Sequence, residues 1–231
     1  MIKKFGVLLF MFQLFACAEL QNIATGDTLT SAEIANGLKE ALTIGISKGA
    51  DALSATDGYY KSEYKILLPE EARKITDKLQ GIPGFSQVEE VILEKINRGA
   101  EDAAKKAKPI FVNAIKQMTF QDALGILMGA DDAATQYLDK TTRTALYTEF
   151  HPDIVNSLNK FNAIEYWANA VNTYNKIPFV EKMNPSLDQY VTEQALNGLF
   201  GMVKKEEGKI RTDLSARTSD LLKKVFAKQD K

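Results

Sequence analysis

The sequence predicts an all-α fold, built as a single compact domain of about eight or nine helices. Apolar side chains recur every three or four residues over most of the chain, which is the period of a helix with one buried face. Capping residues, prolines and glycines divide this pattern into segments of helix length. Because no repeat of roughly 20 to 50 residues is evident, a solenoid is not expected.

The first helix is expected to begin at Thr30, which forms a capping box with Glu33. The residues that follow give one apolar stripe with a spacing of four: Ile34, Leu38, Leu42 and Ile46. Asp57-Gly58 and three nearby tyrosines interrupt the helical pattern. We therefore expect a loop over residues 54–68, with one short extended segment near 64–68.

Prolines, glycines and caps delimit the helices in the middle of the chain. Pro69 and two glutamates suit the first turn of a helix, which Gly81 to Gly84 would end. A long helix is predicted from about Ser86, interrupted by Pro109 and continued to Met118. Thr119 and Asp122 have the spacing of a helix start, for a short helix that ends near Gly129.

The second half of the chain is expected to hold the most deeply buried helix. Asp131 is predicted to cap a helix that stops at His151-Pro152, before two shorter helices that contain Phe161, Trp167 and Tyr174. An irregular link with Pro178 and Pro185 precedes the most apolar helix, expected from residues 186–188 to about Arg211 and near the centre of the fold. A last short helix contains Leu221, Leu222, Val225 and Phe226.

Composition and charge exclude several classes of function. The 231 residues include 29 basic and 30 acidic side chains, for a formal charge of −1, so we expect no nucleic-acid partner. One Cys and one His exclude a disulfide framework, a Cys/His zinc site and most nucleophilic triads. The common nucleotide-binding, hydrolase and metalloprotease motifs do not occur either. We expect no metal site and no cofactor.

The N-terminus has the pattern of an export signal over residues 1–16. Lys3 and Lys4 precede an apolar run over residues 5–12, which is shorter than the roughly 20 residues a membrane-spanning helix needs. Leu14-Phe15-Ala16-Cys17 then resembles the lipobox of bacterial lipoproteins, in which the Cys is acylated and becomes the new N-terminus. Cys17 is therefore the predicted lipidation site. The alternative is an ordinary signal peptide and a soluble periplasmic protein.

A lipidated Cys17 would set the organisation and location of the mature chain. Residues 17–30 are small and polar and are expected to form a flexible tether, with the helical domain at residues 31–227. If sorting follows the enterobacterial rule, Ala18 after the Cys favours the outer membrane, with the domain facing the periplasm. The first expected partner is thus the membrane, bound through the N-terminal lipid.

Two stretches of the sequence resemble a bacterial family known only as domain of unknown function 4197. The first comprises residues 108–119 (KPIFVNAIKQMT), 122–127 (DALGIL) and 129–137 (GADDAATQY). The second comprises residues 190–200 (YVTEQALNGLF), followed by Glu206-Glu207, Ile210-Arg211 and residues 221–226 (LLKKVF). The resemblance implies an α-helical domain, often exported, from Gram-negative bacteria. It implies no activity.

Six polar residues form the candidate ligand or carboxylate site: Asp131, Asp132, Thr135, Glu206, Glu207 and Arg211. Paired carboxylates could bind a cation or exchange protons with a substrate. The simpler interpretation is structural, with the aspartates capping a helix and Glu207 pairing with Arg211 one turn later. Aromatic residues, among them Tyr59, Tyr60 and Tyr64, could line a ligand cavity, although such residues more often form the core.

These observations favour a cell-envelope lipoprotein with no catalytic residues, whose helical module binds another envelope protein or an apolar ligand. The alternative is a carboxylate-based enzyme, metal-dependent or not, with the four acidic residues converging on a cleft. A spacer without a ligand is a third hypothesis.

Overall fold

The computed structural model describes residues 29–183 and 185–227. The chain separates into two units, residues 1–30 and residues 31–231, and the helical domain is the second of these. The predicted signal peptide, Cys17 and nearly all of the tether lie outside the described residues.

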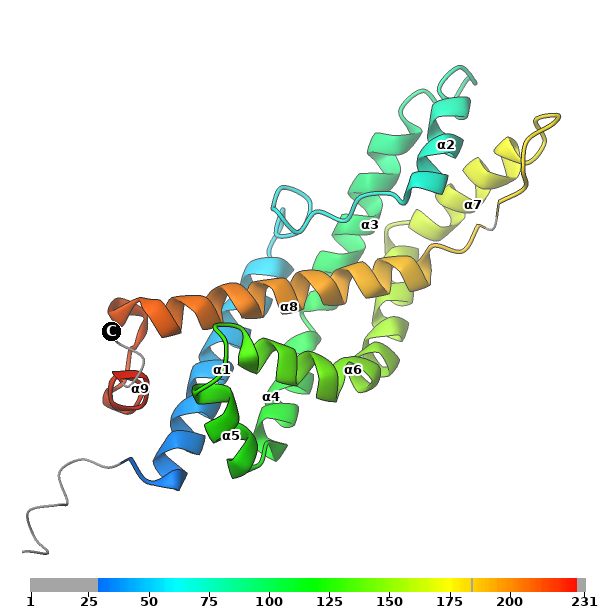
Figure 1. Cartoon of the computed structure of the whole chain (residues 1–231). Helices are drawn as coiled ribbons and strands as arrows, with labels where there is room; N and C mark the ends of the chain where they lie inside the picture. Colours follow the sequence, from blue (N-terminus) through cyan, green and yellow to red (C-terminus); the bar gives the residue numbers. More distant parts are fainter. Residues whose placement is uncertain (1–28, 184, 228–231) are drawn as a thin grey trace, which may run out of the picture. The chain divides into compact units, whose positions relative to one another are not determined.

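The fold is all-α, as the sequence predicts (Figure 1). The described residues contain no strand and form nine α-helices and one short 3₁₀ helix: α1 (Ser31–Ser54), α2 (Glu70–Leu79), α3 (Val88–Ala104), α4 (Ala107–Gln117), α5 (Phe120–Leu127), α6 (Ala133–Lys160), α7 (Ala163–Tyr174), α8 (Asp188–Thr212), η1 (Leu214–Ala216) and α9 (Asp220–Phe226).

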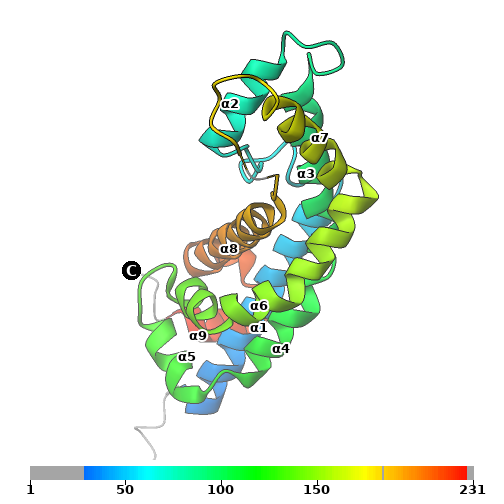
Figure 2. The ribbon, with the colours of Figure 1, turned by 90° about the vertical axis from the view of Figure 1, so that its right-hand side faces the viewer.

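Helix α8 lies against three other long helices, α1, α3 and α6 (Figures 1 and 2). Its apolar side chains are buried on this side, including Val191, Leu199 and Val203. The predicted stripe of α1, from Ile34 to Ile46, is also buried. Burial of these apolar faces is the main favourable contribution to folding, and it places α8 near the centre of the domain as expected.

The predicted extended segment near 64–68 does not form a strand. Its backbone is bound by a side chain instead: the Ile66 N–H donates to Asn97 Oδ1 at 2.8 Å, and Asn97 Nδ2 donates to the Ile66 carbonyl at 2.9 Å. One amide side chain thus supplies the two hydrogen bonds that a neighbouring strand would otherwise make.

The predicted helix break at His151-Pro152 is wrong, because α6 runs through both residues. Pro152 cannot donate a hydrogen bond to the carbonyl of Thr148, but Thr148 is exposed and water can bind that oxygen. Phe150 and Ile154 are fully buried on the other side of the helix. Their packing outweighs the local preference of proline. One helix, α7, therefore follows where two were expected.

The break near Pro109 occurs at Lys105 and Lys106, because Pro109 lies in the first turn of α4, where no intrahelical N–H is needed. Thr119 and Asp122 form the capping box at the start of α5, as their spacing predicts.

Gly58 provides a test of the packing at the end of α1. A Cβ at this position would lie 2.4 Å from the carbonyl oxygen of Ala52 and 2.6 Å from that of Leu53, both backbone atoms. We expect Gly58→Ala to lower the free energy of unfolding by about 2 kcal/mol or more, measured by urea denaturation. Gly208→Ala is the matched control, since a Cβ there meets no atom within 4 Å and a helical Ala should add about 0.5–1 kcal/mol. Equal effects of the two substitutions would contradict this packing.

Candidate functional site

Glu207 and Thr135 are brought together where α8 crosses the start of α6. The Glu207 carboxylate accepts hydrogen bonds from the backbone N–H groups of Ala134 (3.0 Å) and Thr135 (2.8 Å). It also accepts one from the Thr135 hydroxyl, at 2.7 Å. The first N–H groups of a helix have no intrahelical partner and attract negative charge. Glu207 therefore caps α6 from another helix.

Arg211 extends this arrangement to the end of α5. Its Nε donates to Glu207 Oε1 at 2.9 Å, and its terminal nitrogens donate to the carbonyls of Ile126 (3.0 Å) and Leu127 (3.3 Å). These carbonyls belong to the last turn of α5, the negative end of the helix dipole, where positive charge is favoured. We call Thr135, Glu207 and Arg211 the helix-end clamp, because they join the end of α5 to the start of α6.

The helix-end clamp is almost completely buried. The side chains of Arg211 and Glu207 are only 2% and 5% exposed. Taking two charges out of water is costly, and the cost is offset here by their mutual attraction and by five further hydrogen bonds. The predicted pairing of Glu207 with Arg211 is present, and its role is to hold helix ends.

The predicted cap by Asp131 or Asp132 is wrong. Asp132 occupies the N-cap position of α6 but makes no capping hydrogen bond. Its carboxylate instead accepts from Lys204 Nζ at 2.6 Å and Gln136 Nε2 at 2.7 Å. The bond from Lys204 holds the pKa of the Asp132 carboxyl below its ordinary value. Asp131 is exposed. The capping function falls to Glu207, 72 residues away from Thr135 in sequence.

Glu206 lies on a different side of α8 from Glu207, since adjacent helical residues point about 100° apart. It pairs with Lys209, one turn along the same helix. The four predicted carboxylates thus bind different partners: Asp132 binds Lys204, Glu206 binds Lys209, Glu207 binds Arg211, and Asp131 is exposed. In the part of the chain that the structure describes, no three His, Cys, Asp or Glu side chains form a group that could hold a metal ion.

A small apolar cavity adjoins the helix-end clamp. It is lined by Leu38 and Leu42 of α1, by Val203 and Ile210 of α8, by Phe226 and by the clamp charges. Its volume of about 10 Å³ matches about one water-sized sphere. This space is too small for an apolar ligand.

The three tyrosines of the 55–69 loop have different surroundings. Tyr59 is fully buried, and its hydroxyl donates to the Ala195 carbonyl at 2.7 Å. Burial raises the pKa of this phenol. Tyr60 borders an open hollow of about 410 Å³ at the surface, together with Lys65 and polar residues of the α2–α3 region. Tyr64 lies against Gly201 of α8.

Three buried polar residues that we did not identify from the sequence have the same kind of role as the clamp. Glu101 accepts hydrogen bonds from the N–H groups of Tyr59 and Tyr60, and Asn97 binds Ile66. Arg217 donates to the carbonyls of Ile210 and Arg211 at the end of α8. The available signal was the position of Asn97 and Glu101, which lie beside the apolar stripe of α3 where apolar residues would be expected.

No helix in the described part of the chain combines the length and hydropathy that a membrane span requires.

Replacing Glu207 tests the structural role of the clamp. Glu207→Gln would leave the buried Arg211 guanidinium without a counter-charge and weaken the cap of α6. We expect the free energy of unfolding, measured by urea denaturation, to fall by about 3–5 kcal/mol. Asp132→Asn is the matched control, because its partner Lys204 is 61% exposed and the loss should be much smaller.

The double variant Glu207→Gln/Arg211→Met should be more stable than the sum of the single losses predicts, since it removes both buried charges. Equal losses in Glu207→Gln and Asp132→Asn would contradict the clamp.

Comparison with protein families gives one match: a family model described as "Protein of unknown function (DUF4197)" covers residues 28–227. Neither the curated proteins nor the solved structures include a match to this chain.

Proposed function

Because the chain belongs to the DUF4197 family, whose description assigns no activity, we propose a function from the residues of the chain itself. We propose that it is a lipid-anchored protein of the cell envelope, whose helical domain acts without catalysis by binding another envelope protein. Different observations support the three parts of this proposal: the lipid anchor, the non-catalytic role and the protein partner.

The anchor is supported by the N-terminal sequence. A basic start, a short apolar run and the lipobox-like residues Leu14 to Cys17 occur in the order that lipoprotein export requires. The family match begins at residue 28, so the proposed signal and most of the tether precede the family domain. Two or more acyl chains on Cys17 would bind a bilayer stably, since each buried methylene contributes about 0.8 kcal/mol.

A non-catalytic role is supported by how the candidate carboxylates are used. Glu207 is a buried candidate for acid–base chemistry. Its carboxylate accepts three hydrogen bonds from α6 and one from Arg211. A carboxylate that reacts with a substrate needs an approach for that substrate and a free lone pair. All the hydrogen bonds of the Glu207 carboxylate are made within the fold. This observation favours the non-catalytic proposal over the carboxylate-based enzyme.

A protein partner is favoured over an apolar ligand by the distribution of apolar side chains. The cavity beside the clamp holds about 10 Å³, whereas small-molecule sites usually measure roughly 300–1,000 Å³. The hollow of about 410 Å³ beside Tyr60 is large enough, but it is open and lined mostly by polar and charged residues, which do not suit an apolar ligand. In contrast, several large apolar side chains are exposed on the surface, among them Met128, Phe179 and Leu214. Single exposed apolar residues are common on protein surfaces, but a fully exposed aromatic side chain is the kind of residue that is enriched in protein interfaces, and this distinguishes Phe179 at 106% exposure.

The anchor can be tested by replacing Cys17. We expect Cys17→Ser to abolish incorporation of radiolabelled palmitate and to move most of the protein from the membrane to the soluble fraction, because the acylated sulfur is lost. Ala18→Asp is the matched control, because it leaves the acylated Cys in place. It should keep both the label and the membrane association, with a shift toward the inner membrane where enterobacterial sorting applies. Unchanged membrane association of Cys17→Ser would overturn the proposed anchor.

A further inference from the structure

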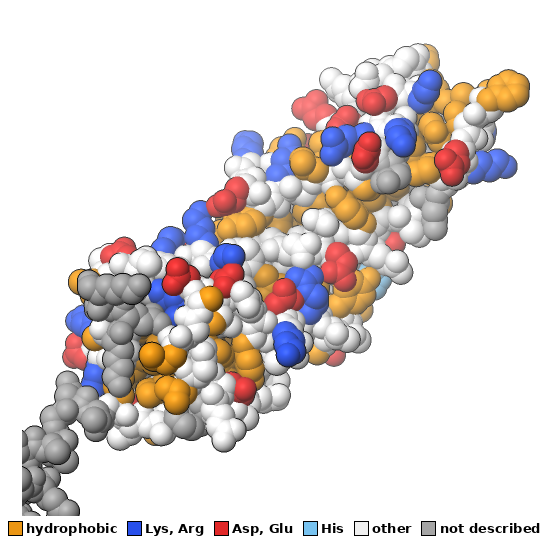
Figure 3. All heavy atoms as spheres, viewed as in Figure 1, with side chains coloured by type: hydrophobic (Ala, Val, Ile, Leu, Met, Phe, Trp, Pro, Cys, Tyr) orange, Lys and Arg blue, Asp and Glu red, His pale blue; other side chains and the backbone are white. Residues whose placement is uncertain are grey.

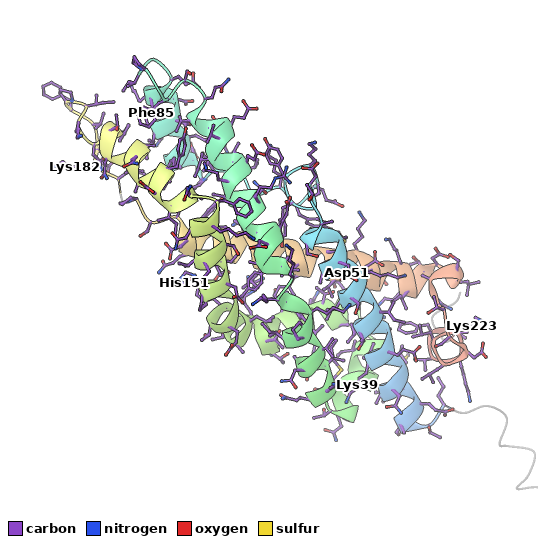
Figure 4. The ribbon with its side chains drawn as sticks, turned by 180° about the vertical axis from the view of Figure 1, so that it is seen from behind. Lys39, Asp51, Phe85, His151, Lys182 and Lys223 are labelled. Atoms are coloured by element: carbon purple, nitrogen blue, oxygen red, sulfur yellow. The ribbon has the colours of Figure 1, made fainter. Side chains whose placement is uncertain are left out.

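Two loops at one end of the helical domain have similar sequences. The link between α2 and α3 contains Ile82-Pro83-Gly84-Phe85, and the link between α7 and α8 contains Ile177-Pro178-Phe179. Phe85 and Lys182, one from each link, are labelled at the same end of the domain in Figure 4. We call residues 80–87 and 175–183 the Ile-Pro loops.

Phe179 is the most exposed large apolar residue among the described residues. Its relative exposure is 106%, against 67% for Met128, the next highest. Figure 3 shows apolar side chains at the tip of this end, where Figure 1 draws the link after α7. Phe179 also has a φ of 63°, a left-handed conformation that is unfavourable for a bulky residue. Exposure and strain both disfavour this arrangement in the isolated domain.

The loop that presents Phe179 is held by hydrogen bonds. The side-chain amide of Asn175 binds the backbone of Met183 twice, accepting from its N–H and donating to its carbonyl, both at 3.0 Å. The Ile177 N–H donates to the Tyr174 carbonyl at 2.9 Å, which continues the end of α7 into the loop. The outward position of Phe179 is therefore part of a closed loop, and a preorganised group loses less entropy on binding.

The second loop is held in a similar way. The Phe85 N–H donates to the Ile82 carbonyl at 3.0 Å, across a turn in which Gly84 has a φ of 88°. Ile82 and Phe85 are half-buried, and Pro83 is exposed. Two separate chain segments thus add apolar surface at the same end of the domain, since α2 packs against α7.

The charges around Phe179 favour a partner with acidic groups. Lys176 and Lys182 are exposed and flank Phe179 in sequence, and Glu181 is the one acidic residue between them. An apolar centre with a charged rim is the common anatomy of a protein interface, in which aromatic residues are enriched.

The position of the loops favours a protein over a bilayer as the occupant. Figures 1 and 4 place them at the opposite end of the helical domain from the start of α1. The 24 residues of α1 alone span about 36 Å. The proposed tether of thirteen residues, 18–30, has an r.m.s. reach of roughly 20 Å. The loops and the tethered residue Ser31 thus lie at opposite ends of the domain, which allows the loops to contact a protein beyond the bilayer surface.

We infer that the Ile-Pro loops are the docking surface of this protein, on which Phe179 enters an apolar pocket with an acidic rim on a second envelope protein. This inference deepens the proposed function and rests on it for the orientation of the domain.

Site-specific photo-cross-linking in the full-length, membrane-bound protein tests the inference. Benzoylphenylalanine at position 179 should form one discrete adduct with a different protein, and the same group at position 128, at the end of α5, should not. The protein in the adduct is then identified by mass spectrometry and purified. The affinity of this partner for the full-length protein should fall at least about tenfold with Phe179→Ser and change less than about twofold with Met128→Ser.

Both substituted side chains are exposed, so both variants should keep the circular dichroism and thermal midpoint of the wild type. Lys182→Glu should also weaken binding, and this effect should decrease as salt is added.

Four results would overturn the inference: adducts only with phospholipid, adducts only with a second copy of this chain, equal adducts from positions 179 and 128, or no adduct from 179. A blue shift of Phe179→Trp fluorescence on vesicles of phosphatidylethanolamine and phosphatidylglycerol would equally favour a bilayer. Position 179 could form no adduct with another protein while Cys17→Ser still releases the protein from membranes. That result would support the anchor and contradict only the docking surface.

Discussion

The buried pair of Glu207 and Arg211 connects the ends of α5 and α6 to α8. The other polar contacts among these helices, such as those of Lys204 with Asp132 and of Arg143 with Glu193, are more exposed to solvent. Each charge is paired with the other and also with backbone groups at a helix end, Glu207 at the start of α6 and Arg211 at the end of α5. The pair therefore links the α5–α6 turn to α8, beside the apolar contacts that α8 makes with α1. Removing one charge would leave the other buried without a counter-charge. Both residues are therefore needed for the stability of the domain.

The same principle recurs elsewhere in the domain. Arg217 donates hydrogen bonds to two carbonyl groups at the end of α8, and Glu101 and Asn97 bind the backbone of the 55–69 loop. Hydrogen bonds to the carboxylates of Glu101 and Asp57 raise the pKa of the Arg98 guanidinium beside this loop. Buried polar side chains here satisfy backbone groups at helix ends and in a long loop, and this use accounts for their burial without any ligand.

Local signals in the sequence were sufficient for the helices but not for the contacts between them. The apolar stripe of α1 and the capping box of Thr119 and Asp122 depend on residues within one or two turns, so spacing alone predicts them. Pro152 misled the prediction because the packing of Phe150 and Ile154 decides the course of α6. The i,i+4 pair of Glu207 and Arg211 could be predicted, but its capping of α6 could not, since it joins residues more than 70 positions apart.

The two ends of the domain have different proposed roles: the anchor precedes α1, and the docking surface lies at the Ile-Pro loops. The core between them contains the helix-end clamp. Native-state hydrogen exchange at the amides of Ala134 and Thr135 tests that core most directly, because first-turn amides are normally unprotected. We predict that both exchange only through global unfolding, as slowly as amides in the middle of α8. Exchange at the rate of exposed first-turn amides would show that Glu207 does not cap α6. Its carboxylate would then be available to act on a substrate.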